Sequence, residues 1–586
     1  MTTASSSSQP SQTDVKNNIL PKATVQKVMA YVPPLEGRRT KIRLDFNENT
    51  VGFPEAYENL EPTWINTYPE YQQFLQQLST TFNTPANQIL ITNGSDEALC
   101  VLANTFIEPN VDRAILSKPT FALIPHYLTL AGSELIQVPI LPNLDHDIPA
   151  LEAELKKGAK LAVFASPDNP TGTLFPQDVM MRWVEEFPNT LFVMDEAYSE
   201  YSGKTLLPFL NERISQGYSN LMTTRTFSKA WALAGLRLGL VIGHPEMIGY
   251  MTRVRSPYSV NTLAVALASN LLPQKETVLA QASDAVSRKD QLICDLETRG
   301  YPVKYGHGSF FLMKVGQDAK TLDQFVSQHN LLLRDRSTVP ELKGMIRVST
   351  GTTEENQILL NLIDSFKQKR ALLFDLDGTL VDTSKSYDET VKYLVHHYSN
   401  KTLDISELET LRNNGGFNDD WDATLEILKQ RGITDISWDE IAQKGTEYYL
   451  SIAKDNEALY ISEETLKKLQ TRYRLGIVTG RYANEFDAIW KDRLSPYFEV
   501  MICRDTQLNM GGKPSPDTLN LALEKMGLSE GVYVGNNGDD MRAAKAAGLT
   551  AIGIATTQSA KNLEKAGAEY LIHTPAEYEE FFGLAL

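Results

Sequence analysis

Short, uninterrupted apolar runs recur along the sequence, and polar residues or glycine follow each of them. In the first half these runs lie at residues 88–94, 160–167, 191–198 and 238–245, with longer amphipathic stretches between them. Continuous apolar strands of this length are typical of a sheet that is buried on both faces. Ligands of such sheets bind beyond the carboxyl ends of the strands. We therefore predict an α/β fold whose functional residues follow its strands.

The same pattern starts again at residue 371, after a charged segment at residues 366–370. A chain of 586 residues is also too long for one hydrophobic core. We predict one enzyme domain at residues 23–366 and a second at residues 371–586. The polar, serine-rich residues 1–22 are expected to be a disordered lead-in.

Composition narrows the class of partner and the compartment. The formal net charge of -17 disfavours a nucleic-acid partner, because DNA and RNA phosphates attract a basic surface. The three cysteines, Cys100, Cys294 and Cys503, are far apart, so neither a disulfide framework nor a zinc site is implied. The sequence shows no signal-peptide pattern and no apolar run long enough to span a bilayer. We expect a cytoplasmic location, with no membrane partner.

One lysine in the first half has the neighbours that a pyridoxal 5'-phosphate (PLP) site requires. Lys229 follows Thr226 and Ser228 and precedes Arg237. A PLP site needs a lysine that binds the cofactor covalently, with hydroxyl and guanidinium groups for the cofactor's phosphate. The planar guanidinium suits phosphate because it donates two hydrogen bonds at once. This spacing predicts that Lys229 is catalytic.

Other residues in the first half suit the ring of the same cofactor. Asp195 ends an apolar run and could keep the pyridine nitrogen protonated, so that the ring accepts electrons. Tyr198 and Asn169 could donate to the phenolic oxygen, and Phe121 could stack on the ring. Residues 93–99 follow a strand and open a helix, whose first amides can bind phosphate.

Each of these strings also has an ordinary structural explanation, but chance does not account for all of them in this order. The segment from about residue 31 to 366 resembles the fold-type I aminotransferases, and specifically the histidinol-phosphate aminotransferases. The resemblance includes LDFNENTVGFP at residues 44–54, TYPEY at 67–71 and MIRVSTGTTEEN at 345–356. It implies a large α/β domain with a small domain, and a homodimer.

The resemblance also assigns roles to individual residues. Lys229 would bind the cofactor, and Tyr68 would reach the phosphate of the cofactor in the neighbouring subunit. Tyr31, Arg334 and Arg347 would bind the substrate, the two arginines at its anionic end. The remaining phosphate-binding residues would be Ser95, Asp96, Thr226, Ser228 and Arg237.

Arg334 and Arg347 differ in how well the sequence alone supports their roles. For Arg334, a solvated surface loop is the alternative explanation. Arg347 lies in an otherwise apolar strand, where an unpaired buried charge would be costly, so a functional role is favoured.

Three positions depart from this family's usual pattern. Phe121 stands where the family often has tyrosine, and Asp168 and Ser309 stand where asparagine is usual. None of these changes removes the chemistry. The changes at Asp168 and Ser309 leave the substrate open.

Two aspartates follow the first apolar run of the second half, in the string DLDGT. Asp375 could attack phosphorus and form an aspartyl-phosphate. Asp377 could protonate the leaving alcohol and later deprotonate water. The alternative is an ordinary Asp-Gly turn at Asp377 and Gly378.

Three further strings favour phosphate chemistry. Thr479 and Gly480 could hold phosphoryl oxygens, and Lys513 could neutralise the phosphate and the nucleophile. Asp539 and Asp540 lie in VGNNGDDM, where magnesium, which prefers oxygen ligands, could bind.

Residues 375–586 are similar to the haloacid dehalogenase-like phosphohydrolases. That resemblance implies a Rossmann-like domain with a helical cap at about residues 384–469, and a Mg²⁺ site formed by Asp375, Asp377, Asn536 and Asp540. Asn536 departs from the family, which usually has aspartate there. Asparagine can still ligate magnesium through its carbonyl oxygen, but it adds no charge.

The sequence leaves three functional hypotheses. In the first, the chain transfers an amino group from glutamate to imidazole-acetol phosphate in histidine biosynthesis and then hydrolyses the phosphate of the product. In the second, the aminotransferase acts on another amino acid or amino-alcohol phosphate. In the third, the aminotransferase is active and the second domain is a binding module without catalysis.

Overall fold

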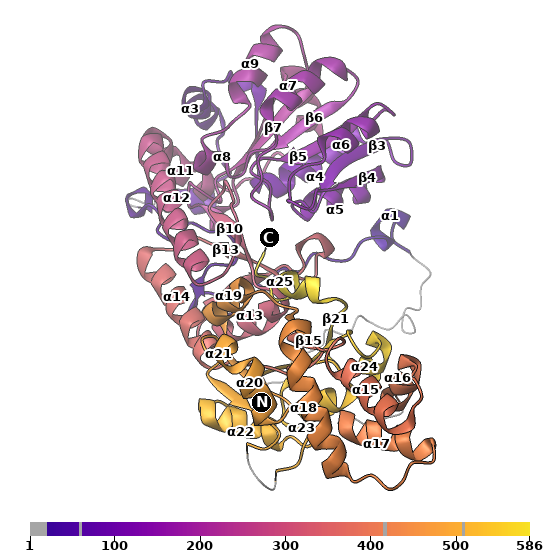
Figure 1. Ribbon diagram of the computed structural model, residues 1–586. Helices are drawn as coiled ribbons and strands as arrows, with labels where there is room; N and C mark the ends of the chain where they lie inside the picture. Colours follow the sequence, from indigo (N-terminus) through magenta and orange to yellow (C-terminus); the bar gives the residue numbers. More distant parts are fainter. Residues whose placement is uncertain (1–19, 58–60, 414–418, 507–509, 586) are drawn as a thin grey trace. The chain divides into compact units, whose positions relative to one another are not determined.

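The computed structural model describes residues 20–57, 61–413, 419–506 and 510–585 (Figure 1). Of the predicted lead-in at residues 1–22, residues 1–19 lie outside the described residues. Compactness divides the chain into two units, which are described separately. The first contains Met1–Ser287, Tyr305–Leu312 and Ser349–Gly351, and the second contains Arg288–Lys304, Met313–Val348 and Thr352–Leu586. The domain boundaries at residues 366 and 371 stay a prediction.

The first unit is built on a seven-stranded sheet. Its strands, in spatial order, are β2 (Ile89–Thr92), β8 (Gly239–Gly243), β7 (Leu221–Thr226), β6 (Leu191–Asp195), β5 (Leu161–Ala165), β3 (Arg113–Lys118) and β4 (Glu134–Pro139). Strand β8 runs antiparallel to both of its neighbours, and the other pairs are parallel. This arrangement confirms the predicted α/β class.

Both faces of this sheet are covered by helices, which explains the continuous apolar runs. Successive residues of a strand point to opposite faces, and Leu191 and Val193 belong to one core cluster while Phe192 and Met194 belong to another. The helices that contribute to the first cluster are α4 (Gly94–Phe106), α5 (Leu123–Ala131) and α10 (Pro245–Val254). Those that contribute to the second include α3 (Gln72–Phe82), α6 (Ile148–Leu155), α7 (Gln177–Glu186), α9 (Leu207–Ser215), α11 (Thr262–Leu271) and α12 (Lys275–Thr298).

A smaller sheet follows in the sequence. Its order is β12 (Arg334–Asp335), β13 (Met345–Ser349), β10 (Phe310–Lys314) and β9 (Val303–Lys304), and the second unit adds helices α13 (Ala319–Gln328) and α14 (Thr353–Gln368). Helix α14 begins with a capping box, in which Thr352 and Glu355 each bind the other's backbone amide. The chain then enters the second large sheet directly.

That sheet has six parallel strands. Their spatial order is β18 (Val500–Ile502), β17 (Arg474–Val478), β14 (Ala371–Phe374), β19 (Gly531–Gly535), β20 (Thr550–Ile554) and β21 (Tyr570–Ile572). Asp375, Thr479 and Asn536 come directly after β14, β17 and β19. Because these three strands are neighbours, the three residues lie at the same edge of the sheet.

A helical insertion separates β14 from β17. Helices α15 (Tyr387–Ser399), α16 (Ile405–Asn413), α17 (Asp420–Gln430) and α18 (Trp438–Asn456) share apolar clusters of their own. The next helix, α19 (Glu463–Arg472), instead packs Leu466 and Leu469 into the core of the six-stranded sheet. The insertion with its own core therefore ends at Asn456, before the predicted limit of about residue 469.

The two linkers of the insertion lie side by side. Strand β15 (Val381–Asp382) enters the insertion and pairs antiparallel with β16 (Ala458–Leu459), which leaves it. This pairing brings the two ends of the insertion close to the DLDGT loop.

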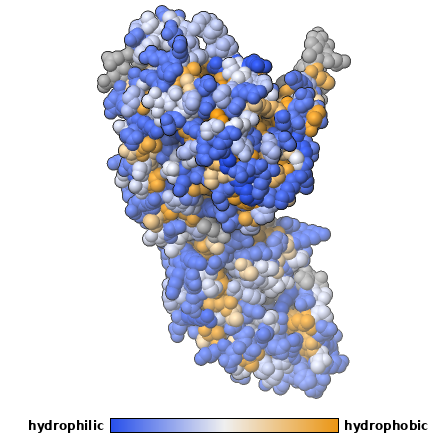
Figure 2. Space-filling model, turned by 90° about the horizontal axis from the view of Figure 1, so that it is seen from above, coloured by the Kyte–Doolittle hydropathy of each residue, from blue (hydrophilic) through white to orange (hydrophobic). Residues whose placement is uncertain are grey.

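The face shown in Figure 2 is hydrophilic over most of its area, with small groups of apolar residues. Within the described parts of the chain, every helix is too short or too polar to cross a membrane.

Candidate active sites

The first site has a buried carboxylate at the end of β6. Asp195 is buried, and its Oδ1 accepts a hydrogen bond of 2.8 Å from the Thr224 hydroxyl of neighbouring β7. Burial raises the pKa of Asp195 to about 6, and the charge of Asp96 adds to this shift. A protonated ring nitrogen beside this carboxylate would stabilise its charged form. Asp195 therefore suits the cofactor role predicted for it.

Lys229 and Tyr198 lie together in this unit. Lys229 follows β7, and its Nζ donates to the Phe46 carbonyl oxygen at 2.8 Å and lies 5.6 Å from the centre of the Tyr198 ring. The Tyr198 hydroxyl accepts a hydrogen bond of 2.9 Å from Asn47 Nδ2. Two residues expected to bind one cofactor are thus brought together from segments 31 residues apart.

Asn47 is a site residue that the sequence did not single out. Its backbone amide donates to Ser349 Oγ at 2.9 Å, and the Ser349 hydroxyl donates back to Asn47 Oδ1 at 2.8 Å. The residue is buried and has a φ of 56°, a region in which asparagine is enriched. Its place in the string LDFNENT was the only signal available from the sequence.

The residues expected to hold the cofactor's phosphate meet at the start of α4. Arg237 Nη2 pairs with Asp96 Oδ2 at 2.8 Å, and Arg237 Nη1 donates to Ser228 Oγ at 3.1 Å. Thr226 lies nearby, because its hydroxyl oxygen accepts a hydrogen bond of 3.1 Å from the Ser228 amide. A guanidinium, two hydroxyls and the first turn of a helix form a suitable phosphate cradle.

Two glycines allow this close packing. Gly94 has a φ of +75°, and a Cβ there would lie 2.6 Å from Arg237 Nη2. A Cβ on Gly239 would lie 2.6 Å from the Ser95 amide nitrogen. The space beside Arg237 and the buried Ser95 therefore exists only because both positions lack a side chain.

Two of the three departures from the family pattern, Asp168 and Ser309, place polar side chains in buried positions. Asp168 is fully buried, and its Oδ1 accepts a hydrogen bond of 2.7 Å from the Thr120 hydroxyl, while Oδ2 has no hydrogen-bond partner. Burial raises the pKa of Asp168 to about 7. The hydroxyl of buried Ser309 also lacks a partner. Asn169 and Phe121, which follow Asp168 and Thr120, are half-buried.

Four predicted residues of the first half remain, namely Tyr31, Tyr68, Arg334 and Arg347. Tyr68 and Tyr31 are exposed, at 76% and 44%, and the Tyr68 ring packs against Tyr258 with centres 4.6 Å apart. Arg334 and Arg347 belong to the second unit, where they are directly paired across β12 and β13. Directly paired residues project from the same face of a sheet. The roles of these four residues stay predictions.

The second site centres on a lysine between two carboxylates. Lys513 Nζ donates to Asp375 Oδ1 at 2.6 Å and to Asp540 Oδ1 at 2.8 Å. Both aspartates are buried, and burial raises the pKa of Asp375 to about 7 although Lys513 opposes the shift. Lys513 therefore lies beside the predicted nucleophile, as expected of the group that neutralises it.

Asp540 holds the loop after β19. Its Oδ2 accepts hydrogen bonds of 3.1 Å from the amides of Asn536 and Asn537, and its Oδ1 also accepts from the Tyr533 hydroxyl at 3.2 Å. With Lys513, four donors occupy this carboxylate. In this structure Asp540 positions its neighbours, and its role as a metal ligand stays a prediction.

Asn536 is oriented in a way that suits a metal ligand. Its Nδ2 donates to Thr557 Oγ1 at 2.9 Å, and the Thr557 hydroxyl donates to the Asn536 carbonyl oxygen at 3.2 Å. The buried Oδ1 atom has no hydrogen-bond partner. The described residues contain no group of three or more His, Cys, Asp or Glu side chains arranged to hold a metal. The fit to magnesium therefore rests on Asn536 Oδ1 together with the neighbouring Asp375.

Asp377 contacts Arg481, an arginine to which the sequence motifs assign no role. The carboxylate of Asp377 pairs with the guanidinium of Arg481, which follows Thr479 and Gly480 in the string VTGR. Thr479 is buried and accepts a hydrogen bond of 3.1 Å from the Arg481 amide, whereas Gly480 is exposed. The signal for Arg481 in the sequence was weak, since it is only a charged residue two positions after Thr479.

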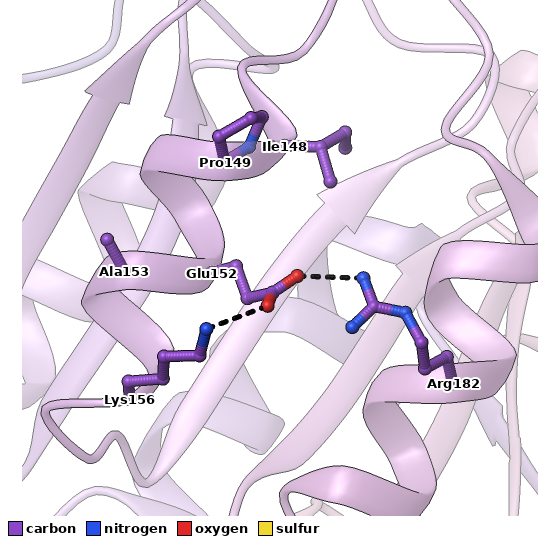
Figure 3. Close-up of a pocket in the computed structure, with 6 residues that line it drawn as sticks. All are labelled: Ile148, Pro149, Glu152, Ala153, Lys156 and Arg182. Atoms are coloured by element: carbon purple, nitrogen blue, oxygen red, sulfur yellow. Dashed lines mark hydrogen bonds and ion pairs between the residues drawn. The ribbon is translucent and has the colours of Figure 1, made fainter.

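A shallow surface pocket on α6 and α7 is a poor third candidate (Figure 3). Its charged residues pair with one another, since Glu152 binds Arg182 at 2.7 Å and Lys156 at 3.0 Å (Figure 3). The side chains of Lys156 and Arg182 are 65% and 42% exposed, so these are surface pairs, unlike the buried pair of Lys513 and Asp375 in the second site.

Comparison with known proteins supports the two enzyme families that the sequence resembles. Residues 39–363 match the family Aminotransferase class I and II, and residues 372–554 match the family Haloacid dehalogenase-like hydrolase. A histidinol-phosphate aminotransferase of Symbiobacterium thermophilum is 32% identical over 350 residues, which cover 57% of this chain and 95% of that protein. One of Ruminiclostridium cellulolyticum is 30% identical over 334 residues, covering 55% and 91%.

Solved structures show the same fold in the first part of the chain. A histidinol-phosphate aminotransferase of Sinorhizobium meliloti, in complex with pyridoxal-5'-phosphate, has a TM-score of 0.53 at 23% identity, covering 59% of this chain and 97% of that one. One of Clostridium acetobutylicum has a TM-score of 0.51 at 17% identity, covering 55% and 98%. The chain belongs to the aminotransferase class I and II family, and it also carries a haloacid dehalogenase-like hydrolase domain.

Proposed function

We propose that the protein is a PLP-dependent aminotransferase joined to a magnesium-dependent phosphomonoesterase. The first half would transfer an amino group from glutamate to imidazole-acetol phosphate and form L-histidinol phosphate, a step of histidine biosynthesis. The second half would hydrolyse the phosphate of this product. The observation that carries the proposal is the grouping of Lys229, Tyr198 and Asp195 in the same unit as the Arg237 cradle. The names of the relatives support the choice of substrate.

When bound, PLP supplies an electron sink for the carbon next to the amino group. Asp195 would hold a proton at the ring nitrogen, because its buried carboxylate is stabilised by a cationic neighbour. Tyr198 and Asn169 would orient the ring through its phenolic oxygen. Lys229 Nζ would remove a proton from the amino-bearing carbon of glutamate, and would give a proton to the corresponding carbon of imidazole-acetol phosphate when that substrate receives the amino group.

The anionic end of the substrate would be bound by Arg334 and Arg347. The two residues are directly paired on adjacent strands, so their side chains start from the same face of the sheet. Two guanidinium groups on one face suit a phosphate or a carboxylate. Tyr31 would add a contact, and Tyr68, which is 76% exposed, would reach the site of a second copy in a homodimer.

In the second half the reaction would proceed in two steps. A bond forms between an Asp375 oxygen and phosphorus as the ester bond breaks, and Asp377 gives its proton to the leaving oxygen. Water then attacks phosphorus, returns a proton to Asp377 and releases phosphate. Lys513 would neutralise charge at Asp375, and Thr479 and Gly480 would hold phosphoryl oxygens. Magnesium, held by Asp375 and Asn536 with Asp377 or Asp540, would screen the phosphate charge.

The test is an assay of the purified full chain with glutamate, imidazole-acetol phosphate and magnesium. We expect formation of 2-oxoglutarate, followed by release of inorganic phosphate. Lys229→Ala should abolish the first product, and Asp375→Asn should abolish the second when histidinol phosphate is supplied. Wild-type protein that releases no phosphate from histidinol phosphate would contradict the proposed second activity.

A different substrate is a second candidate. The unpartnered Oδ2 of Asp168 and hydroxyl of Ser309 differ chemically from the asparagines usual in the family, which favours a changed substrate. Turnover of another oxo acid, or of an amino-alcohol phosphate, well above that of imidazole-acetol phosphate would select this candidate. Absence of any magnesium-dependent phosphomonoesterase activity would instead favour a non-catalytic second domain, as the change at Asn536 allows.

A further inference from the structure

Arg481 has a position in the second site that the proposed reaction does not yet use. Its side chain is fully buried, and it pairs with the carboxylate of Asp377 through Nη2 and, at 3.4 Å, through Nε. The Asp377 side chain is itself 30% exposed. One side of the Asp377 carboxylate, the proposed general acid and base, therefore contacts a buried cation. The other side remains accessible to solvent.

A second carboxylate binds another edge of the Arg481 guanidinium. Glu457 is fully buried and accepts from both terminal nitrogens of Arg481 at 3.2 Å. It also accepts from the hydroxyls of Ser386 at 2.7 Å and Tyr449 at 2.9 Å and from the indole of Trp490 at 2.6 Å. Five hydrogen bonds leave this carboxylate little freedom, so Glu457 fixes the place of the guanidinium.

The aromatic rings of the insertion complete the surroundings of Arg481. Its guanidinium carbon lies 5.3 Å from the centre of the Tyr387 ring and 5.5 Å from that of Tyr449, and these rings are stacked 4.4 Å apart. Tyr387 is in turn held through its hydroxyl, which donates to Glu485 at 2.9 Å. The rings, like Glu457, belong to the helical insertion or its linkers.

We propose that Arg481 is a positioning residue for Asp377, and that Glu457 fixes Arg481 to the two linkers of the helical insertion. The inference deepens the proposed phosphomonoesterase function and rests on it. Lys513 holds Asp375 independently, at 2.6 Å. Loss of Arg481 should therefore impair protonation of the leaving oxygen rather than attack on phosphorus.

Two phosphate esters distinguish these effects. In p-nitrophenyl phosphate the leaving oxygen departs without a proton, whereas the alcohol of benzyl phosphate requires one. The full chain with magnesium should show a fall in kcat/KM for benzyl phosphate of about 100-fold in Arg481→Met, the usual scale of general acid catalysis. For p-nitrophenyl phosphate we expect kcat/KM to stay within about threefold. The ratio kcat/KM reports only the steps up to and including phosphoryl transfer to Asp375. The later attack by water therefore does not affect it.

Two further variants keep the test decisive. Arg481→Lys retains the charge without the planar fork, so it should show the same selective loss at about 10-fold. It serves in place of Arg481→Met if the latter does not fold. Arg474→Met is the control, because Arg474 lies at the other end of β17 in an exposed pair with Glu499. It should leave both rates unchanged.

The outcomes separate the inference from the function on which it rests. An equal fall for both esters would show a general structural effect and overturn the inference, as would unchanged rates in folded Arg481 variants. A wild-type chain that hydrolyses neither ester with magnesium would overturn the proposed function and the inference with it.

Discussion

Single residues show how the two sites differ in electrostatics. Asp375 has a lysine of its own chain at 2.6 Å, whereas Asp195 is bound by the Thr224 hydroxyl. Burial raises the pKa of both carboxyl groups, to about 7 and about 6. The second site thus contains a positive charge beside its carboxylate, namely Lys513. The carboxylate of the first site suits a positive charge that a bound cofactor would supply.

Replacement of Asp195 tests this difference. Asp195→Asn should weaken PLP binding by about 10- to 100-fold, because a hydrogen bond to a charged group contributes about 1.5–3 kcal/mol. The measurement is a titration of the cofactor-free protein with PLP. Asp178→Asn, at an exposed position in the first turn of α7, is the matched control and should not change the affinity. Equal affinity in Asp195→Asn and wild type would contradict the assignment.

Asp168 predicts a pH dependence of stability. Its folded pKa of about 7 exceeds the ordinary value of 3.8, so the folded state keeps a proton that the unfolded state releases. The free energy of unfolding should therefore fall as the pH rises from about 4 to about 7, by up to about 4 kcal/mol. Asp168→Asn should remove this contribution. In cofactor-free protein, the melting temperature of Asp168→Asn minus that of wild type should be larger at pH 8 than at pH 5. The same difference at both pH values would contradict the prediction.

At the scale of elements, the start of α4 depends on contact with β8. Gly239→Ala should displace this start, because the added Cβ would lie 2.5 Å from the Gly94 carbonyl carbon. We expect a loss of stability of about 1–3 kcal/mol and weaker PLP binding, measured by melting and by cofactor titration. Gly249→Ala in α10, where nothing lies within 4 Å of the new Cβ, is the control. Unchanged PLP affinity in Gly239→Ala would show that the contact does not shape the cradle.

Sequence patterns predict some of the elements but not which part of the fold each element packs against. The apolar runs predict the strands well, because a strand buried on both faces needs apolar residues at every position. The predicted end of the insertion at about residue 469 differs from the structure because α18 and α19 have the same amphipathic pattern. Only the partner of the apolar face tells them apart: Tyr449 packs in the insertion, and Leu466 packs against the sheet.

At the scale of the whole molecule, the second unit joins parts of both sequence halves. Arg472 of α19 donates to the carbonyl oxygens of Phe582 and Gly583 at 2.6 and 2.9 Å and lies 4.4 Å from the Tyr301 ring. Nearby, Arg370 pairs with Asp318 at 2.9 Å. These buried contacts link residues on either side of the predicted boundary.

Arg472→Ala should therefore destabilise the second unit by about 3 kcal/mol or more, because it leaves buried carbonyl oxygens without donors. Chemical denaturation, followed by the phosphomonoesterase activity, would measure the loss. Arg474→Met, two residues away in an exposed pair, should cost less than about 1 kcal/mol. Equal stability of the two variants would show that the buried contacts contribute little.

The sequence by itself determined the α/β class, the order of the motifs and the enzyme families, because these depend on local patterns and on residue types at short spacing. Only the tertiary structure decided that Asn47 supports Tyr198 and that Arg481 lies between Asp377 and Glu457. The partners in these contacts are 24 to 151 residues apart in the chain. Their meeting depends on how helices and sheets pack, and no local pattern specifies that packing.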